Sequence, residues 1–225
     1  YNLASGALWN MGGFGLGQFL RLISNIILTR ILLQEAFGIM ALTMVMISSV
    51  AILSDLGIRA SVVQNPDAEN RKFLDTAWTM NLIRASILFV AICVMAFPFA
   101  DFYETPEIKY LVPMVGLRIL IDAVTTTKLV VYRRHVKIKQ LALIDISGQI
   151  AGLVIMVPLA WYFEAVWTLV VAGLIQSSFR TIMSYVLPGQ NNRLCWDRSS
   201  VRKIYHFGRW IFISTALRFA DGSAD

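Results

Sequence analysis

Four arginines lie well inside apolar stretches of this chain, at Arg21, Arg84, Arg118 and Arg180. An arginine at the centre of a membrane-spanning helix costs about 2.5–3.5 kcal/mol on insertion scales. Four of them therefore cost on the order of 10 kcal/mol unless a buried anion or a water-filled polar cavity compensates their charge. The guanidinium group is planar and permanently charged, which suits it to bind phosphate. The arginines thus predict a carrier of something negatively charged.

Amide side chains accompany the arginines at helical spacing, so each set shares one helix face. A lipid-facing helix would not carry such a polar face, which must instead face the bundle interior or a hydrated cavity. We expect Arg21, Arg84 and Arg118 to contact the cargo. Arg180 is grouped with them, although it lies close enough to the end of its span to reach the headgroup layer instead. The amides expected to line the cavity are Gln18, Asn25, Asn81, Gln149 and Gln176.

Two carboxylates lie in the same apolar stretches. Asp122 follows Arg118 by four residues, so a self-neutralised ion pair is an alternative to ligand binding for that arginine. Asp122 or Asp145 could also couple transport to a proton or a sodium ion, because intramembrane carboxylates often serve such relays. With twice as many arginines as carboxylates, we expect a cationic path across the bilayer that an anionic head group could follow.

The composition indicates a polytopic, all-α membrane protein. Hydrophobic residues make up 57% of the chain, charged residues only 15%, and the mean hydropathy is +0.64. Apolar runs long enough to cross about 30 Å of hydrocarbon occur at residues 6–29, 37–53, 76–99, 110–131, 141–163 and 166–187, and a seventh begins near 207. We expect residues 1–190 to form a six-helix transmembrane lobe, 191–206 an inter-lobe loop, and 207–225 the start of a second lobe in a longer protein.

Lysine and arginine in the loops set the expected orientation. Twelve of them lie in the loops after the second, fourth and sixth spans, against two, Arg30 and Lys109, in the alternate loops. This alternation follows the positive-inside rule, so the N-terminus should be cytoplasmic. The same topology accounts for the net charge of +6, and we infer no nucleic-acid partner from it.

Signatures of catalysis and metal binding are missing from the sequence. The only two histidines, His135 and His206, have no spacing with Cys, Asp or Glu that a metal site would require. The glycines at 12, 13, 15 and 17 follow no strand and precede no Lys-Ser/Thr, so they are not a phosphate loop. We interpret them as a close-packing patch in the first span. No enzyme activity, metal or cofactor is expected.

Three segments resemble motifs of bacterial polysaccharide transporters, the Wzx-type flippases of the multidrug/oligosaccharidyl-lipid/polysaccharide exporter superfamily. Residues 28–42, LTRILLQEAFGIMAL, resemble the signature that links the first two spans of these proteins. Residues 55–64, DLGIRASVVQ, resemble the motif that closes the second span. Residues 206–214, HFGRWIFIS, resemble the start of the seventh span. The resemblance covers essentially the whole chain in span order.

The resemblance implies a two-lobed, MATE-like bundle of which this chain holds the first lobe. It implies alternating access that moves a polyprenyl-pyrophosphate-linked oligosaccharide across the bacterial inner membrane, with membrane lipids, a polysaccharide polymerase and glycosyltransferases as possible partners. An antiporter of small cationic molecules shares the superfamily fold, but it would favour acidic residues in the cavity. A membrane subunit of polysaccharide synthesis without transport activity is an alternative of another class.

Overall fold

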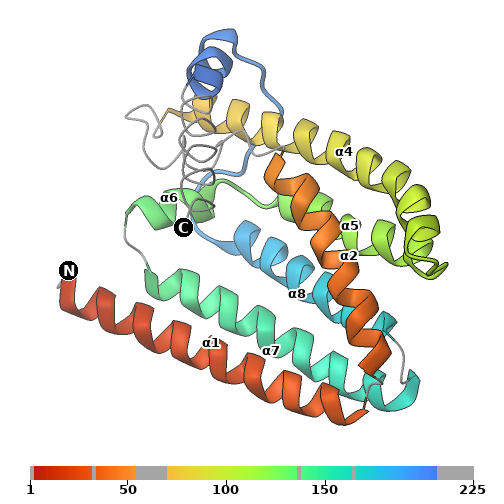
Figure 1. Ribbon diagram of the computed structural model, residues 1–225. Helices are drawn as coiled ribbons and strands as arrows, with labels where there is room; N and C mark the ends of the chain where they lie inside the picture. Colours follow the sequence, from red (N-terminus) through yellow and green to blue (C-terminus); the bar gives the residue numbers. More distant parts are fainter. Residues whose placement is uncertain (1–2, 32–33, 54–69, 136–137, 164–165, 207–225) are drawn as a thin grey trace, which may run out of the picture.

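The computed structural model describes residues 3–31, 34–53, 70–135, 138–163 and 166–206. Within these ranges all regular structure is helical, which confirms the all-α prediction (Figure 1). The helices are α1 (Leu3–Ile31), α2 (Gln34–Leu53), α4 (Arg71–Phe102), α5 (Ile108–Val124), α6 (Lys128–Arg134), α7 (Ile138–Phe163) and α8 (Trp167–Val186), followed by a short helix over residues 198–206.

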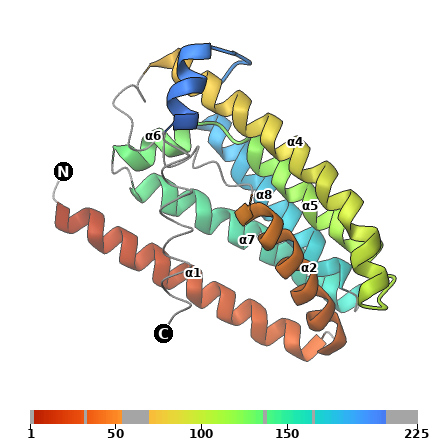
Figure 2. The ribbon, with the colours of Figure 1, turned by 45° about the horizontal axis from the view of Figure 1, so that its top comes forward.

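The long helices pack side by side in an order that differs from their order in the chain. Helix α4 packs on α5, α5 on α8, α8 on α7, and α7 on α1, while α2 lies against α5 and α4. Figures 1 and 2 both show α1 and α7 at one edge of the bundle and α4 at the other. Helix α8 therefore lies between the two helices, α5 and α7, that carry the intramembrane carboxylates.

The bundle is apolar on its outside as well as in its core. On α4 the exposed residues Ile83, Ile87, Val90 and Val94 recur at helical spacing and are 45–66% exposed. A face of this kind suits hydrocarbon as its solvent. Among the described residues, Arg71–Phe102, Lys139–Phe163 and Trp167–Val186 are each long and apolar enough to cross a membrane. The chain is a membrane protein.

The helices overlap the predicted spans, with ends that differ by up to five residues, except at one boundary. The run at residues 110–131 is not one helix, because α5 ends at Val124 and α6 begins only at Lys128. Thr126 lies in the break, where its backbone N–H and its hydroxyl donate to Ser184 of α8 at 3.2 and 3.1 Å. Hydrogen bonds to a neighbouring helix thus replace the continuation of α5. The motif at 55–64, the motif at 206–214 apart from His206, and the expected seventh span lie outside the described residues.

The connection after α8 is held against the rest of the bundle by buried polar groups. Asn192 accepts from the backbone N–H of Thr127 at 2.8 Å, and its Nδ2 donates to Asp75 Oδ1 at 3.2 Å. Asp75 is only 7% exposed. Lys128, 6% exposed, donates to the carbonyls of Tyr185 and Leu187 at the end of α8. These contacts fix the loop beside the ends of α4, α6 and α8.

Candidate functional site

A cavity of about 230 Å³ lies among α1, α2, α5, α7 and α8. It combines residues from four different spans that the sequence predicted to line a cargo site. The predicted residues on its wall are Arg21 and Asn25 of α1, Arg118 of α5, Gln149 of α7 and Gln176 of α8. Arg21 and Asn25 are exposed in the described structure, so the cavity opens beside α1.

The wall of this cavity is cationic. Arg21 and Arg118 line it, and none of the described lining residues is a carboxylate. Among the described residues, no hydrogen bond or ion pair involves the side chain of Arg21, which is exposed. Three carboxamides and Ser24 add donors and acceptors. An anion with several oxygen atoms suits this set of groups, because guanidinium binds such groups with two parallel hydrogen bonds.

The two cavity arginines lie at similar depth. Arg21 is ten residues before the end of α1 at Ile31, and Arg118 is ten residues after the start of α5 at Ile108. At 1.5 Å per residue, each is about 15 Å from the end of its helix. In the orientation that the charge pattern predicts, those ends are the outer ones, so the cavity lies near the middle of the bilayer.

Small residues let α7 and α8 approach each other beside the cavity. A Cβ at Gly152 would lie 3.3 Å from the carbonyl of Ala172, and one at Gly148 would lie 3.4 Å from the carbonyl of Gln176. Glycines four residues apart are a known means of close helix packing in membranes. The sequence interpretation had placed such a patch in the first span instead. Gly12 and Gly15 have nothing within 4 Å of a Cβ, whereas a Cβ at Gly17 would lie 3.3 Å from Nε2 of Gln149 on α7, so of these three described glycines only Gly17 is closely packed.

Arg118 is only loosely held by its expected partner. Its Nε lies 3.9 Å from Asp122 Oδ2, whereas Oδ1 of Asp122 accepts a hydrogen bond from Ser177 of α8 at 2.5 Å. The same guanidinium reaches α8, where Nη1 lies 3.6 Å from the Cβ position of Gly173. Asp122 is therefore tied to α8, and Arg118 keeps donors directed at the cavity.

Arg180 is paired with a carboxylate of a neighbouring helix. Its Nε lies 3.1 Å from Asp145 Oδ1 of α7, an ion pair without hydrogen-bond geometry. This pair lies toward the ends of α7 and α8 that the charge pattern assigns to the cytoplasm. The four arginines therefore do not form a continuous row of unpaired charges across the described helices.

The other predicted residues do not line the cavity. Arg84 of α4 donates from Nη2 to the carbonyl of Ala51 at 3.3 Å, which links α4 to α2. Asn81 lies on the same helix and is half-buried, and Gln18 is exposed on α1. Asn81 and Arg84 belong to α4, which contributes no residue to the wall, and Gln18 belongs to α1 but is not among the lining residues.

Two features of the site were not predicted from the sequence: the apolar part of the cavity wall, and a polar seam of buried hydroxyl groups between α8 and α5. The missed lining residues are Leu28, Met40, Leu153, Met156 and Leu169, which read as ordinary span residues. The seam joins α8 to α5 through Thr181, whose hydroxyl lies 2.8 Å from that of Thr125. Ser177, Thr181 and Ser184 recur at helical spacing and are buried, a signal that the sequence did contain.

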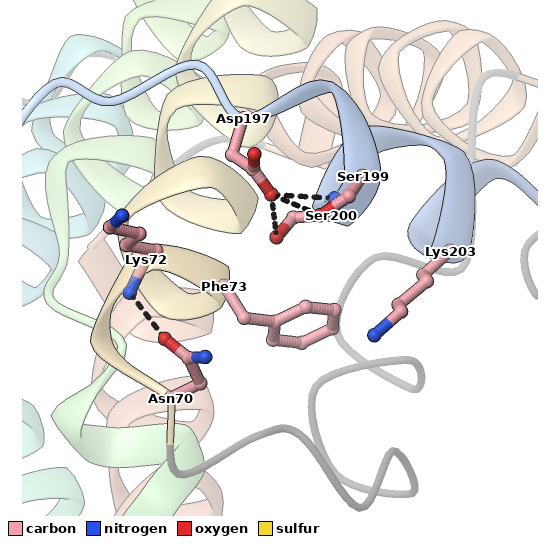
Figure 3. A pocket seen from close by; sticks show the side chains of 7 residues that line it. All are labelled: Asn70, Lys72, Phe73, Asp197, Ser199, Ser200 and Lys203. Carbon is pink, nitrogen blue, oxygen red and sulfur yellow. Dashed lines mark hydrogen bonds between the residues drawn. The ribbon is translucent and has the colours of Figure 1, made fainter.

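A second cavity, of about 250 Å³, lies where α4 and the helix at 198–206 begin (Figure 3). Figure 3 shows Asn70 and Asp197 turned toward the starts of their own helices, whereas the side chain of Lys203 extends away from its helix. Asn70 accepts from the backbone N–H of Lys72, and Asp197 accepts from Ser199 and Ser200. The bonds from Ser199 and Ser200 hold the pKa of Asp197 well below its usual value. Because these groups cap helices, we place no cargo here.

Comparison with known proteins identifies the family. The polysaccharide biosynthesis protein family matches residues 27–225. The chain is 22% identical over 219 residues to the lipopolysaccharide biosynthesis protein WzxC of Escherichia coli, covering 96% of this chain and 44% of that protein. It is 23% identical to the succinoglycan biosynthesis transport protein ExoT of Rhizobium meliloti, covering 92% of this chain and 41% of that protein.

A third relative is the teichuronic acid biosynthesis protein TuaB of Bacillus subtilis, 20% identical over 77% of this chain and 36% of that protein. The chain thus spans less than half the length of these curated relatives. No solved structure matches it significantly. Since the family match extends over most of the sequence, this protein belongs to the polysaccharide biosynthesis protein family.

Proposed function

We propose that the full protein exports a lipid-linked oligosaccharide across the bacterial inner membrane by alternating access, with its N-terminus in the cytoplasm. The observation that carries the proposal is the cavity in which Arg21 and Arg118 meet Asn25, Gln149 and Gln176, with no carboxylate among the described residues of the wall. The relatives named for polysaccharide biosynthesis and transport support the cargo class.

The proposed cargo is a glycan on a polyprenyl diphosphate. Its diphosphate, or an acidic sugar, would bind the arginines, and the amides would bind sugar hydroxyls. The cavity holds only a small part of such a molecule, about 230 Å³. The remainder would occupy the space between this lobe and a second one, with the prenyl chain in the bilayer. A polymerase and glycosyltransferases are proposed partners, since they would consume and supply this cargo.

The alternatives fit the cavity less well. A carrier of cationic molecules needs acidic groups to compensate the cargo charge, and the described wall offers two arginines instead. An enzyme of glycan synthesis would need clustered catalytic carboxylates, and the described residues that line the cavity at Arg21 and Arg118 include no carboxylate. If an ion is coupled to transport, Asp122 is the better candidate of the two carboxylates. It lies beside Arg118, whereas Asp145 is paired with Arg180.

The test is transport by full-length protein reconstituted with its lipid-linked oligosaccharide. Arg21→Gln and Arg118→Gln should each lower the transport rate about 10- to 100-fold, because a charge-assisted hydrogen bond contributes about 1.5–3 kcal/mol. Arg118→Lys should recover part of the loss, since lysine keeps the charge but not the two-pronged geometry. Arg133→Gln, an exposed arginine on α6 away from the cavity, is the matched control. Normal transport by the Arg21/Arg118 double variant would refute the proposed site.

A further inference from the structure

The loop after α8 presents two large apolar side chains outward from a fixed backbone. The N–H groups of Arg193, Cys195 and Asp197 donate to Asp75, Thr79 and Thr76 of α4 at 3.1, 3.1 and 3.3 Å. Between these bonded positions, the side chains of Leu194 and Trp196 are 72% and 57% exposed.

This segment lies at the depth of a membrane interface. It pairs with the first turns of α4, and the outward apolar face of that helix begins at Ile83. Thr79, which binds the loop, is one helical turn before Ile83, about 6 Å along the axis. Leu194 and Trp196 therefore lie just outside the hydrocarbon, where tryptophan side chains are enriched in membrane proteins.

The helix that follows adds positive charge to the same region. Its residues Ser200 and Ile204 are buried, with Ile204 packed against Phe73 and Ala77 of α4. Helical geometry places Arg198 and Arg202 on the opposite face, and both are exposed. Tyr205 is 61% exposed on that face as well.

The charge of this surface is strongly one-sided. Arg193 and Lys203 add two more exposed cations, and the single carboxylate, Asp197, is bonded to Ser199 and Ser200. Apolar and aromatic groups beside arginines form a surface suited to anionic headgroups. The rings and aliphatic chains enter the interface, while the guanidinium groups remain among the phosphates.

We propose that residues 193–205 bind the anionic phospholipids of the cytoplasmic leaflet, so that this loop is a membrane-surface anchor with a preference for negative lipids. The inner leaflet attracts basic segments by about 1 kcal/mol per lysine or arginine, which is about fivefold in membrane partitioning. The inference concerns lipid binding alone and does not depend on which cargo the protein carries.

The experiment measures the depth of position 196 in full-length protein. A variant whose only cysteine is Trp196→Cys carries a spin label and is reconstituted in vesicles rich in phosphatidylglycerol or made of phosphatidylcholine alone. The accessibility of the label to oxygen is compared with its accessibility to a water-soluble nickel chelate. We expect greater protection from nickel in the anionic vesicles. Arg198→Gln with Arg202→Gln should remove that difference, reducing partitioning about 25-fold, and Arg133→Gln should retain it.

Three results would overturn the inference. One is equal nickel accessibility in the two kinds of vesicle, and another is a lipid dependence that survives the double arginine variant. The third is a label that is immobilised and shielded from both oxygen and nickel in every vesicle, since this would mean that protein, not lipid, covers the segment.

Discussion

Asn192→Asp is the most discriminating single change that the structure offers, because it alters one atom in the network that fixes the loop after α8. The Oδ1 of Asn192 accepts from the backbone and the hydroxyl of Thr127 at 2.8 and 3.0 Å. Its Nδ2 donates to Asp75 Oδ1 at 3.2 Å and to the carbonyl of Leu74 at 3.5 Å. Aspartate keeps the acceptor and replaces the donor with a second carboxylate facing Asp75.

The expected cost has two parts. Losing the Nδ2 bonds removes about 0.5–1.5 kcal/mol for each bond. Two carboxylates about 4 Å apart repel by about 1 kcal/mol in water and about 4 kcal/mol at an effective dielectric constant of 20. The Asp75 side chain is 9% exposed and lies 3.7 Å from Arg71, which partly offsets the repulsion. We therefore expect a loss of about 2–4 kcal/mol in stability.

The assay is thermal unfolding of the full-length protein in detergent, as a double-mutant cycle. Asn192→Asp should lower the midpoint clearly, and Asp75→Asn added to it should recover most of the loss, because the pair again has one amide and one carboxylate. Asn191→Asp is the control, since it makes the same chemical change on an exposed neighbour. If Asn192→Asp melts with the Asn191→Asp control, or if Asp75→Asn gives no rescue, the network does not hold the loop as argued.

Three further predictions concern topology, helix packing and helix capping. In a background without other cysteines, Asn70→Cys should resist an impermeant thiol reagent added to intact cells while Glu104→Cys, in the turn after α4, is labelled; the reverse would invert the orientation. Gly152→Val should lower the unfolding midpoint by the equivalent of about 1–3 kcal/mol, because the added side chain overpacks against α8. Gly15→Ala is the control and should leave the midpoint unchanged or raise it, because the space around its Cβ is open. Equal effects of the two substitutions would contradict the observed packing of α7 on α8. Lys128→Met should lower the thermal unfolding midpoint, because two backbone carbonyls at the end of α8 lose their hydrogen-bond donor. An unfolding midpoint equal to that of the unmodified protein would show that water replaces the lysine as donor.

The composition and the loop charges determined the class of the protein because the bilayer is a demanding solvent. A chain with 57% hydrophobic residues in runs of about 20 must form helices that satisfy their own backbone hydrogen bonds. The helices therefore followed from the apolar runs, with ends that differ by up to five residues. The exception at Val124 arose where Thr126 bonds to Ser184 on another helix, a contact between residues 58 positions apart.

The polar stripes could be found from the sequence because the helical period is fixed, so Gln149 and Gly152, or Gln176 and Arg180, necessarily share a face. Which stripes meet was decided only by the packing order of the helices. That order brings Arg21 of α1 and Arg118 of α5 to one cavity and leaves Arg84 bonded to α2.

The tertiary structure also determined which arginines are paired with a carboxylate. The sequence could pair Arg118 with Asp122 because four residues separate them on one helix, yet the contact is 3.9 Å long, and Asp122 bonds instead to Ser177 of α8. The spacing of residues along one helix determines which side of the helix a side chain lies on. It does not determine the distance from that side chain to a group on another helix. The sequence alone therefore predicted an anion carrier with arginines in its spans, and only the packing of α7 and α8 showed that Arg180 is compensated by Asp145 while Arg21 is not, among the residues described.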